Sequence, residues 1–369
     1  MTYLDYSATT PIDEEVLDTF VKASKYIGNP NSLHSLGIEA KELIDASTKQ
    51  IAKILGVKTE EIIYTSGASE SNNTVIKGIE KYKGKKILTT PLEHSSINAP
   101  LSYLSDKGYE IEMIPLNNGI VEPTTLKKCI TDDTVLITIG AVNSETGIRQ
   151  PIEEIGKMLK KEYPNILFHT DVTQGIGKIK IDLTNVDMAS FAAHKFFGIK
   201  GIGGLIKKEN IKLTPLIHGG KSTTIYRSGT PTTQLIASMA KALRLAYENI
   251  DSDIKHITKL NNKIKENLKK YDDVYINSTK DSIPHILNIS IVGIKPETML
   301  HALEKDNIYI STQSACATGD ISLPIMSITN DKKRASSSIR ISISRKTTEE
   351  EINIFLKSFD KNYRKLKMK

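Results

Sequence analysis

The sequence predicts an α/β fold with a mostly parallel sheet, joined to a smaller α+β domain. Through the first two thirds of the 369 residues, short apolar runs alternate with helical patterns, as strands and helices do in parallel sheets. After about Thr232 the pattern changes to amphipathic helices with a few strand-like runs. The length also suffices for one or two domains with ordinary cores.

The larger domain is predicted to contain six buried strands. Their apolar runs cover residues 62–65, 86–90, 110–114, 134–140, 166–170 and 186–191. Helical patterns separate them, as at 152–161, where Ile152, Ile155 and Leu159 share one face. This alternation predicts the mostly parallel sheet.

The smaller domain is predicted from the pattern after the sheet. Amphipathic patterns cover 234–249 and 257–268, a strand-like run covers 286–292, and a helical pattern covers 298–305. Thr348 and Glu351 form a capping box before the last helix. We expect a large domain of residues 13–255, and a small domain of residues 256–369 that includes residues 1–12.

The composition excludes several classes of protein. No run of about 18 apolar residues predicts a membrane span. The N-terminus lacks the basic and apolar stretches of a signal peptide. Two cysteines are too few for a disulfide framework, which indicates a reducing cytoplasm.

Charge and histidine spacing also argue against two kinds of ligand. The net charge of +7 could suggest nucleic acid, but the lysines are spread along helical segments without interleaved aromatic residues. We therefore expect no direct nucleic-acid binding. The eight histidines show no paired metal spacing, so we expect no bound metal.

Two residues of opposite charge follow predicted strands. Asp171 lies at the sheet edge where α/β proteins bind ligands, and it could hold a protonated ring nitrogen. Taken alone, such an aspartate more often caps a helix or turn. Lys195 ends an apolar run, and desolvation there would lower its pKa and make its amine nucleophilic. Alternatively, it extends from the strand end to solvent.

Two further segments follow strands. In residues 65–72, Gly67 permits a tight turn, and the amides of Ala68 and Ser69 at the helix start can bind a phosphate. The alternative is an ordinary capped helix. His94 could stack on a ring or move protons, although a lone histidine there is more often a loop residue with satisfied hydrogen bonds.

Cys316 is the better candidate nucleophile of the two cysteines. Small and polar residues surround it, which predicts a partly exposed loop where a thiol can react. Cys129 lies on a helical pattern and is expected to be buried and unreactive. Arg340 lies in an alternating strand pattern and could bind a carboxylate with two parallel hydrogen bonds, or form an ion pair on a sheet face.

In order along the chain, these residues resemble the cysteine desulfurases of iron–sulfur cluster assembly. Those are fold-type I pyridoxal-phosphate (PLP) enzymes of the class V aminotransferase group, and the resemblance implies a large domain with a seven-stranded sheet and a small C-terminal domain. It covers nearly the whole chain. The matching segments are residues 3–11, 28–34, 65–72, 93–94, 143–147, 169–174, 194–195, 227–230, 314–316 and 337–340. Each segment is weak alone, but their order is a strong signal.

The resemblance implies a role for each matching residue around the cofactor. Lys195 would hold PLP and move the Cα proton, and Asp171 would pair with the pyridinium nitrogen. His94 would stack on the ring. Asn143 and Gln174 would contact the ring hydroxyl, with Asn143 also near the substrate.

The resemblance also implies how phosphate and substrate bind. The phosphate would be held by Ala68, Ser69 and His194, and by Thr230 of the partner subunit in a homodimer. Arg340 would hold the carboxylate of L-cysteine. Cys316 would attack the substrate sulfur, which gives an enzyme persulfide and L-alanine.

Three features depart from the family pattern. Ala192 replaces a serine or similar hydroxyl, so Ala193 and His194 would compensate for one phosphate hydrogen bond. Gln313 replaces the glycine before Ser-Ala-Cys, so we expect a stiffer or differently placed loop base. We also expect no longer tail after the last helix of the kind with which some relatives dock the cluster scaffold. The long stretch between Cys316 and Arg340 resembles the long-loop group, which delivers sulfur to several acceptors.

We therefore expect a cytoplasmic PLP-dependent L-cysteine desulfurase that passes sulfur to an iron–sulfur scaffold or a tRNA-thiolation enzyme. One alternative is another PLP enzyme, such as a selenocysteine lyase or an aminotransferase; transamination would not need Cys316. The other is a non-catalytic scaffold. Ala192 and Gln313 are its only support, and Lys195 with Asp171 argues against it.

Overall fold

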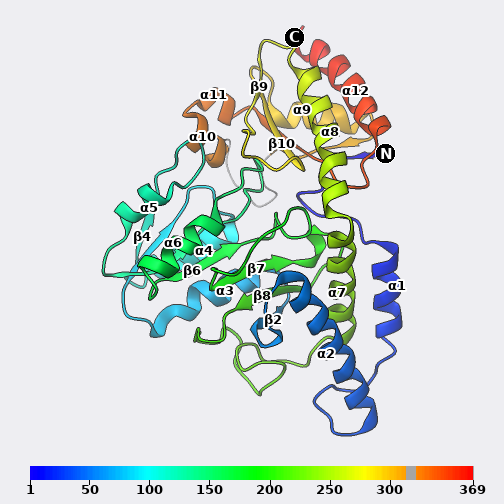
Figure 1. Ribbon diagram of the computed structural model, residues 1–369. Coiled ribbons are helices and arrows are strands. Elements are labelled where there is room, and N and C mark those ends of the chain that lie inside the picture. The colour runs from blue at the N-terminus through cyan, green and yellow to red at the C-terminus, as the bar shows by residue number, and fades with distance from the viewer. Residues whose placement is uncertain (313–320, 369) are drawn as a thin grey trace.

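A seven-stranded sheet forms the centre of the larger part of the molecule, as the computed structural model shows for residues 1–312 and 321–368 (Figure 1). The strand order is β2-β8-β7-β6-β5-β3-β4. The strands are β2 (Ile62–Thr65), β3 (Lys86–Thr89), β4 (Glu110–Met113), β5 (Thr134–Thr138), β6 (Leu167–Asp171), β7 (Met188–Ala192) and β8 (Gly203–Lys207). From β7 to β4 all neighbours run parallel, whereas β8 is antiparallel to β7 and β2. The predicted mostly parallel sheet is confirmed.

Two details of the sheet differ from the sequence prediction. Strand β4 was expected to be buried, but it forms the edge of the sheet and both its ends are exposed. Strand β8 was not predicted. It begins at Gly203, where an added Cβ would lie 2.4 Å from the carbonyl oxygen of Phe191 on β7. Close strand packing therefore explains a glycine that the sequence pattern left without a role.

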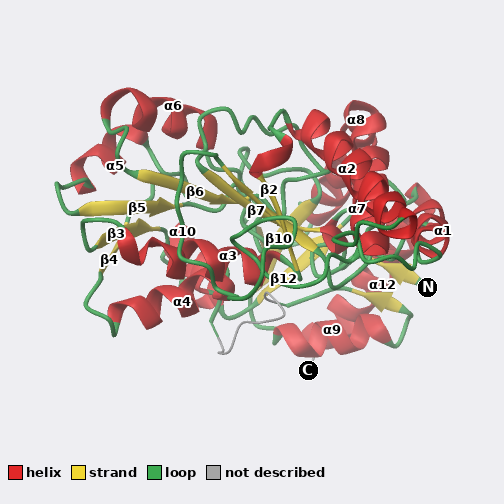
Figure 2. Cartoon of the chain, turned by 90° about the horizontal axis from the view of Figure 1, so that it is seen from below, coloured by secondary structure: helices red, strands yellow, loops and turns green. Residues whose placement is uncertain are grey.

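Helices cover both faces of the sheet. Figure 2 shows α3 (Ala68–Gly78) and α4 (Ser95–Ser105) on one side of the strands, and α5 (Pro123–Cys129) and α6 (Ile152–Glu162) on the other. On the side of α5 and α6 the same core also takes in α1 (Glu14–Ala23), α2 (Ser35–Leu55) and α7 (Thr233–Glu248). The predicted stripe of α6 is buried at Ile152, Ile155 and Leu159. Apolar helices on both faces thus bury the sheet, which explains why its strands have continuous apolar sequences.

The C-terminal part has its own sheet and core. Its antiparallel sheet has the order β12-β10-β9, with β9 (Val274–Ile276), β10 (Ile286–Ile291) and β12 (Ser338–Ser342). Strand β1 (Thr2–Tyr3) pairs in parallel with β11 (Ile308–Tyr309), which brings the N-terminus to this part. The helices are α8 (Ile250–Leu268), α9 (Pro296–Glu304), α10 (Leu323–Thr329), α11 (Lys332–Ala335) and α12 (Glu349–Lys367).

A separate hydrophobic cluster holds these elements together. It contains Leu4 and buried residues from Ile257 to Phe359. The predicted capping box forms, since Thr348 and Glu351 bond reciprocally at the start of α12. The boundary expected after residue 255 falls within α8, and the division into two domains remains a prediction. Among the described helices, none combines the length and apolarity needed to cross a bilayer.

Candidate active site

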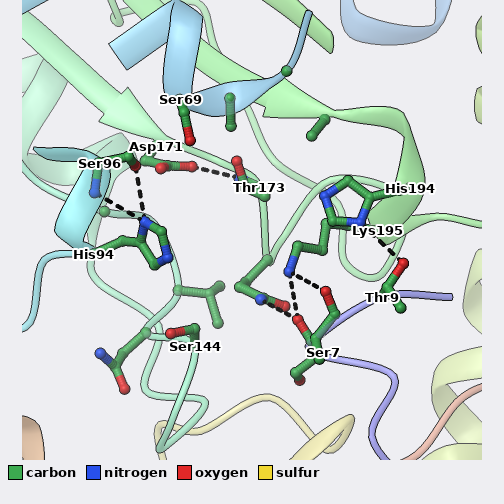
Figure 3. A pocket seen from close by; sticks show the side chains of 18 of the residues that line it. Ser7, Thr9, Ser69, His94, Ser96, Ser144, Asp171, Thr173, His194 and Lys195 are labelled. Atoms are coloured by element: carbon green, nitrogen blue, oxygen red, sulfur yellow. Dashed lines mark hydrogen bonds between the residues drawn. The ribbon is translucent and has the colours of Figure 1, made fainter. Parts of the chain in front are cut away.

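A cavity of about 570 Å³ lies where the parallel strands end and the C-terminal part approaches. The connections after β2, β3, β5, β6 and β7 each contribute lining residues. Nine of the predicted site residues line it: Ala68, Ser69, His94, Asn143, Asp171, Gln174, His194, Lys195 and Arg340. Figure 3 shows His94 and Asp171 on one side of the cavity and Lys195 and His194 on the other. Carboxyl ends of parallel strands are where open α/β sheets bind ligands.

Lys195 follows β7 directly, in the short 3₁₀ turn Ala193–Lys195. Its Nζ donates to the backbone carbonyl of Ser7 over 2.6 Å and to that of Ala8 over 2.8 Å (Figure 3). Because both carbonyls belong to the N-terminal segment, that segment holds the lysine amine in place. An amine at the cavity wall is suited to covalent bonding with a carbonyl compound.

Asp171 is the last residue of β6, and its two carboxylate oxygens have different partners. Oδ2 accepts a hydrogen bond from Asn72 Nδ2 over 2.8 Å, and Oδ1 accepts one from the Thr173 amide over 2.9 Å. Asn72 lies on α3 and also donates to Ser96 Oγ over 2.9 Å. The carboxylate is therefore fixed from α3 and from its own turn, and it faces the cavity as a ready partner for a cation.

His94 is the N-cap residue of α4. Its Nδ1 accepts a hydrogen bond from the Ser96 amide over 3.1 Å and lies 2.9 Å from Ser96 Oγ. The proton of the neutral ring is therefore on Nε2. Burial lowers the pKa of His94 below its usual value. His94 therefore caps α4 with satisfied hydrogen bonds, in line with the alternative interpretation of a structural loop histidine. Its neutral ring also lines the cavity.

Helix α3 begins at the cavity without a side-chain cap. Its N-cap is Gly67, which makes no side-chain capping bond, and Ala68 and Ser69 line the cavity. The helix N-terminus therefore offers backbone amides to an anion. Glu70 lies in the same turn, but its Oε1 accepts from Arg227 Nε over 2.9 Å. That ion pair offsets the negative charge which would otherwise oppose an anion here.

Asn143 and Gln174 both use their amide groups within the protein. Asn143 Oδ1 accepts from the amides of Glu145 over 3.0 Å and Thr146 over 2.8 Å, and its Nδ2 donates to the Leu92 carbonyl over 2.8 Å. Gln174 Nε2 donates to the Ser7 carbonyl over 2.9 Å. Each amide nitrogen retains a second N–H, so the predicted contacts with a ring hydroxyl remain compatible with these bonds.

Arg340 lies on β12 with only 1% of its side chain exposed. Its Nη1 donates to the Ser144 carbonyl over 3.0 Å, and its Nη2 donates to Asp5 Oδ1 over 2.8 Å. Among the described residues, none is a hydrogen-bond partner of the buried Nε. A buried donor without a partner is costly, and Arg340 lines the cavity, where an anionic ligand could accept a hydrogen bond from it.

Three predicted site residues are not placed in the cavity. Ala193 is fully buried and its amide donates to the Ile202 carbonyl over 3.1 Å. Thr230 lines a separate hollow with Arg227. Cys316 lies outside the described residues, as does Gln313. The predicted roles of Ala193, Thr230 and Cys316 stay predictions.

His194 and Ala192 form the cavity wall beside Lys195. His194 Nδ1 lies 3.1 Å from Thr9 Oγ1, and burial lowers the pKa of His194 to about 4. The ring is therefore neutral and could donate a hydrogen bond to a phosphate from one nitrogen. Ala192 lines the cavity as the last residue of β7, without the hydroxyl that the family pattern has there.

Sequence reasoning missed two buried ionisable groups at or near the cavity. Glu93 accepts hydrogen bonds from the Gly140 amide over 3.0 and 3.1 Å and from Thr90 Oγ1 over 2.7 Å, and burial raises its pKa to about 7. Lys178 donates to Gln174 over 2.6 Å. Glu93 could have been suspected from its place beside His94 after a strand. Within the described residues, no group of three or more His, Cys, Asp or Glu side chains could hold a metal.

Known proteins resemble this chain over nearly its whole length. The model of the aminotransferase class-V family matches residues 2–355. The chain belongs to this family. The cysteine desulfurase IscS of Rickettsia prowazekii is 40% identical over 366 residues, which cover 95% of this chain and 88% of the relative. The resemblance to cysteine desulfurases is confirmed, and these families are PLP-dependent.

Solved structures agree with the fold. A NifS-like protein aligns over all of both chains with a TM-score of 0.92 and 36% sequence identity. A structure described as SspA in complex with cysteine has a TM-score of 0.82 and 29% identity, and covers 94% of this chain and all of that one. The predicted class V aminotransferase fold is confirmed.

Proposed function

We propose that the protein is a PLP-dependent L-cysteine desulfurase that uses the cavity at Lys195. The observation that carries this proposal is the opposition of the Lys195 amine and the Asp171 carboxylate across one cavity, with the uncapped start of α3 at its wall. The lysine amine can bond to the PLP aldehyde, the carboxylate can pair with the pyridinium nitrogen, and the helix start can bind the phosphate. Relatives named cysteine desulfurase support the substrate, and selenocysteine lyase, other PLP chemistry and a scaffold role are not favoured.

The residues present fit PLP. Lys195 would hold it covalently, and Ala68, Ser69 and His194 would bind its phosphate. Asp171, held by Asn72 and Thr173, would keep the ring nitrogen protonated. Bound there, PLP would supply an electron sink for the bonds at the substrate Cα.

The remaining residues would position the substrate and move its protons. Arg340 has its guanidinium fixed by Asp5 and Ser144, so its Nε, which has no partner in the described part of the chain, could meet the carboxylate of L-cysteine without reorganisation. Lys195 would move the proton between Cα and its own amine. The Cys316 thiolate would take the sulfur atom of L-cysteine, which leaves a persulfide on the enzyme and L-alanine as product.

The exposed apolar residues support the expected homodimer. Eight of the large hydrophobic side chains exposed in the described part lie close together in the sequence, before and at the start of α2: Ile12, Leu17, Val21, Tyr26, Ile27, Leu33, Leu36 and Ile38. A large exposed apolar surface is typical of a subunit contact, and these eight side chains come from one stretch of the chain, residues 12–38. We propose a second copy of this chain as its partner. The family transfers sulfur to acceptor proteins; whether the acceptor here is an iron–sulfur scaffold or a tRNA-thiolation enzyme, and the cytoplasmic location, stay predictions.

Absorbance spectroscopy tests the cofactor site. The purified protein, incubated with PLP and then desalted, should retain visible absorbance that shifts when L-cysteine is added. Lys195→Ala should lose the covalently held cofactor but keep its fold by circular dichroism. Lys200→Ala is the matched control, since Lys200 also lines the cavity but does not follow the strand end directly. A wild-type protein that retains no PLP would refute the proposal.

A further inference from the structure

Lys178 is a buried lysine in the turn that follows β6, and it does not line the cavity that contains Lys195. Only 8% of its surface is exposed. Its Nζ donates to Gln174 Oε1 over 2.6 Å, and within the described residues it takes part in no ion pair. Burial lowers the pKa of Lys178 well below its usual value. A buried amine without a carboxylate costs stability, so an apolar side chain would serve packing better.

The charged groups that shift the pKa of Lys178 are cations, and Asp253, which lines the same small hollow, forms no ion pair with it in the described part. Lys195 after β7 and Arg340 on β12 both repel its charge. His285, which precedes β10, and His194 both have pKa values lowered first by burial and also by nearby lysines, including Lys178. No neighbour in the described part therefore compensates the lysine as a counter-ion, and its one polar side-chain contact is the Gln174 amide oxygen.

A chain of hydrogen bonds links Lys178 to the cofactor lysine. Lys178 Nζ holds Gln174 Oε1, and Gln174 Nε2 donates to the Ser7 carbonyl over 2.9 Å. The same carbonyl accepts from Lys195 Nζ over 2.6 Å. An amide side chain can be flipped end for end at little steric cost, so its direction is set by its partners. Here Lys178 and the Ser7 carbonyl together favour the direction in which oxygen faces Lys178 and nitrogen faces Ser7.

We propose that Lys178 is a positioning residue, which holds the Gln174 amide with its nitrogen directed toward the cofactor site. This inference rests on the proposed function, because the hydrogen-bond acceptor it serves is the ring hydroxyl oxygen of PLP. In the flipped direction, the amide oxygen would face that ring oxygen and the Ser7 carbonyl, which are both acceptors. Burial of the lysine thus lowers stability but fixes the Gln174 amide nitrogen as a hydrogen-bond donor to the cofactor.

The test uses the PLP-loaded protein and the variants Lys178→Met, Lys178→Arg and Gln174→Leu. The readout is the pH midpoint at which the visible absorbance of bound PLP changes, which reports proton loss from its link to Lys195. A hydrogen-bond donor at the ring oxygen favours that loss. Lys178→Met should therefore raise the midpoint by about half a pH unit or more. Lys178→Arg keeps a hydrogen-bond donor, and the longer side chain can extend into the small hollow beside Lys178. Its pH midpoint should therefore stay near the wild-type value.

Two further measurements separate positioning from a structural role. Thermal unfolding of the PLP-free Lys178→Met protein should occur at the wild-type temperature or above it, because no buried charge is left unpaired. In the Gln174→Leu background, Lys178→Met should shift the midpoint no further, because the lysine acts through that amide. Lys180→Met is the control, since Lys180 is exposed and pairs with Asp251.

The outcomes are distinct. An unchanged midpoint in Lys178→Met, or an equal further shift in the Gln174→Leu background, would overturn the positioning role while PLP binding stands. A lower unfolding temperature of Lys178→Met with an unchanged midpoint would make the lysine structural. A wild-type protein that takes up no PLP would overturn the proposed function together with this inference.

Discussion

Arg340 on β12 donates through Nη2 to Oδ1 of Asp5 over 2.8 Å, and this contact joins two ends of the chain at the cavity. Asp5 follows the N-terminal strand β1, and the same segment provides the Ser7 and Ala8 carbonyls that hold Lys195. The segment therefore positions both the proposed carboxylate-binding group and the proposed cofactor lysine. Neither group needs to move far to meet a ligand, which favours tight positioning of the substrate.

Arg340→Lys should weaken substrate binding more than turnover. A lysine has a single ammonium group and cannot replace a planar guanidinium that is already fixed by Asp5 and Ser144. We expect the KM for L-cysteine to rise about tenfold or more, with a smaller fall in kcat. Steady-state alanine production measures both. Arg334→Lys, at a residue bonded to Asn277 away from the cavity, is the control. An unchanged KM would exclude Arg340 from carboxylate binding.

Glu93→Gln should stabilise the protein at alkaline pH. The folded-state pKa of Glu93 is raised to about 7 by burial, above the ordinary 4.5 of a glutamate. The folded chain therefore holds this proton more tightly than the unfolded chain, and that contribution is lost as pH rises from about 4.5 to 7. Glutamine carries no charge and can still accept from the Gly140 amide.

We expect Glu93→Gln to raise the free energy of unfolding at pH 8 by roughly 1–3 kcal/mol relative to wild type, and by much less at pH 5. Urea unfolding at the two pH values measures this difference. Glu80→Gln, at an exposed position, serves as the control. Equal effects of Glu93→Gln at both pH values would show that its carboxyl does not titrate in this way.

His285→Gln should make the protein less sensitive to acid. Burial lowers the pKa of His285 to about 3, against the usual 6.5, so the unfolded chain binds this proton more readily. Its contribution to stability is complete above about pH 6.5 and is lost as pH falls toward 3. The variant should lose about 1–3 kcal/mol less stability between pH 6.5 and 4 than wild type. His301→Gln, on the exposed surface, is the comparison; identical acid profiles for wild type and His285→Gln would contradict the prediction.

Charges in the exposed apolar segment before α2 should dissociate the proposed homodimer. Ile27 and Leu33 are 82% and 93% exposed in the single chain. Burial of each side chain would contribute about 1.5–3 kcal/mol, so Ile27→Asp with Leu33→Asp should weaken association by about a hundredfold or more. Sedimentation would then report one chain where wild type gives two. Met113→Asp on β4 is the control, and a variant that stays dimeric would place the contact elsewhere.

Much of the fold could be predicted from the sequence because its strands are buried on both faces. Strands β2, β3, β5, β6 and β7 carry continuous apolar runs, and their ends agree with the predicted runs to within two residues. Strand β8 could not be found because its first two residues are glycines, which give no apolar pattern. The exposure of β4 could not be predicted either, since strand order is a property of the whole sheet.

The candidate site was predictable where a residue follows a strand directly. Asp171 and Lys195 end β6 and the turn after β7, and both line the cavity. Lys178 and Glu93 were missed because their importance comes from a partner's position in space. The Gln174 amide and the Gly140 backbone acquire these contacts only in the folded chain.

Alanine release from L-cysteine tests the central claim most directly. Wild-type protein loaded with PLP, without added reductant, should release alanine and gain one sulfur atom on the peptide that contains Cys316, as mass spectrometry would show. Cys316→Ser should retain PLP absorbance and form neither the persulfide nor more than a trace of alanine, and Cys129→Ser should behave as wild type. Normal alanine and sulfide production by Cys316→Ser under these conditions would contradict the account.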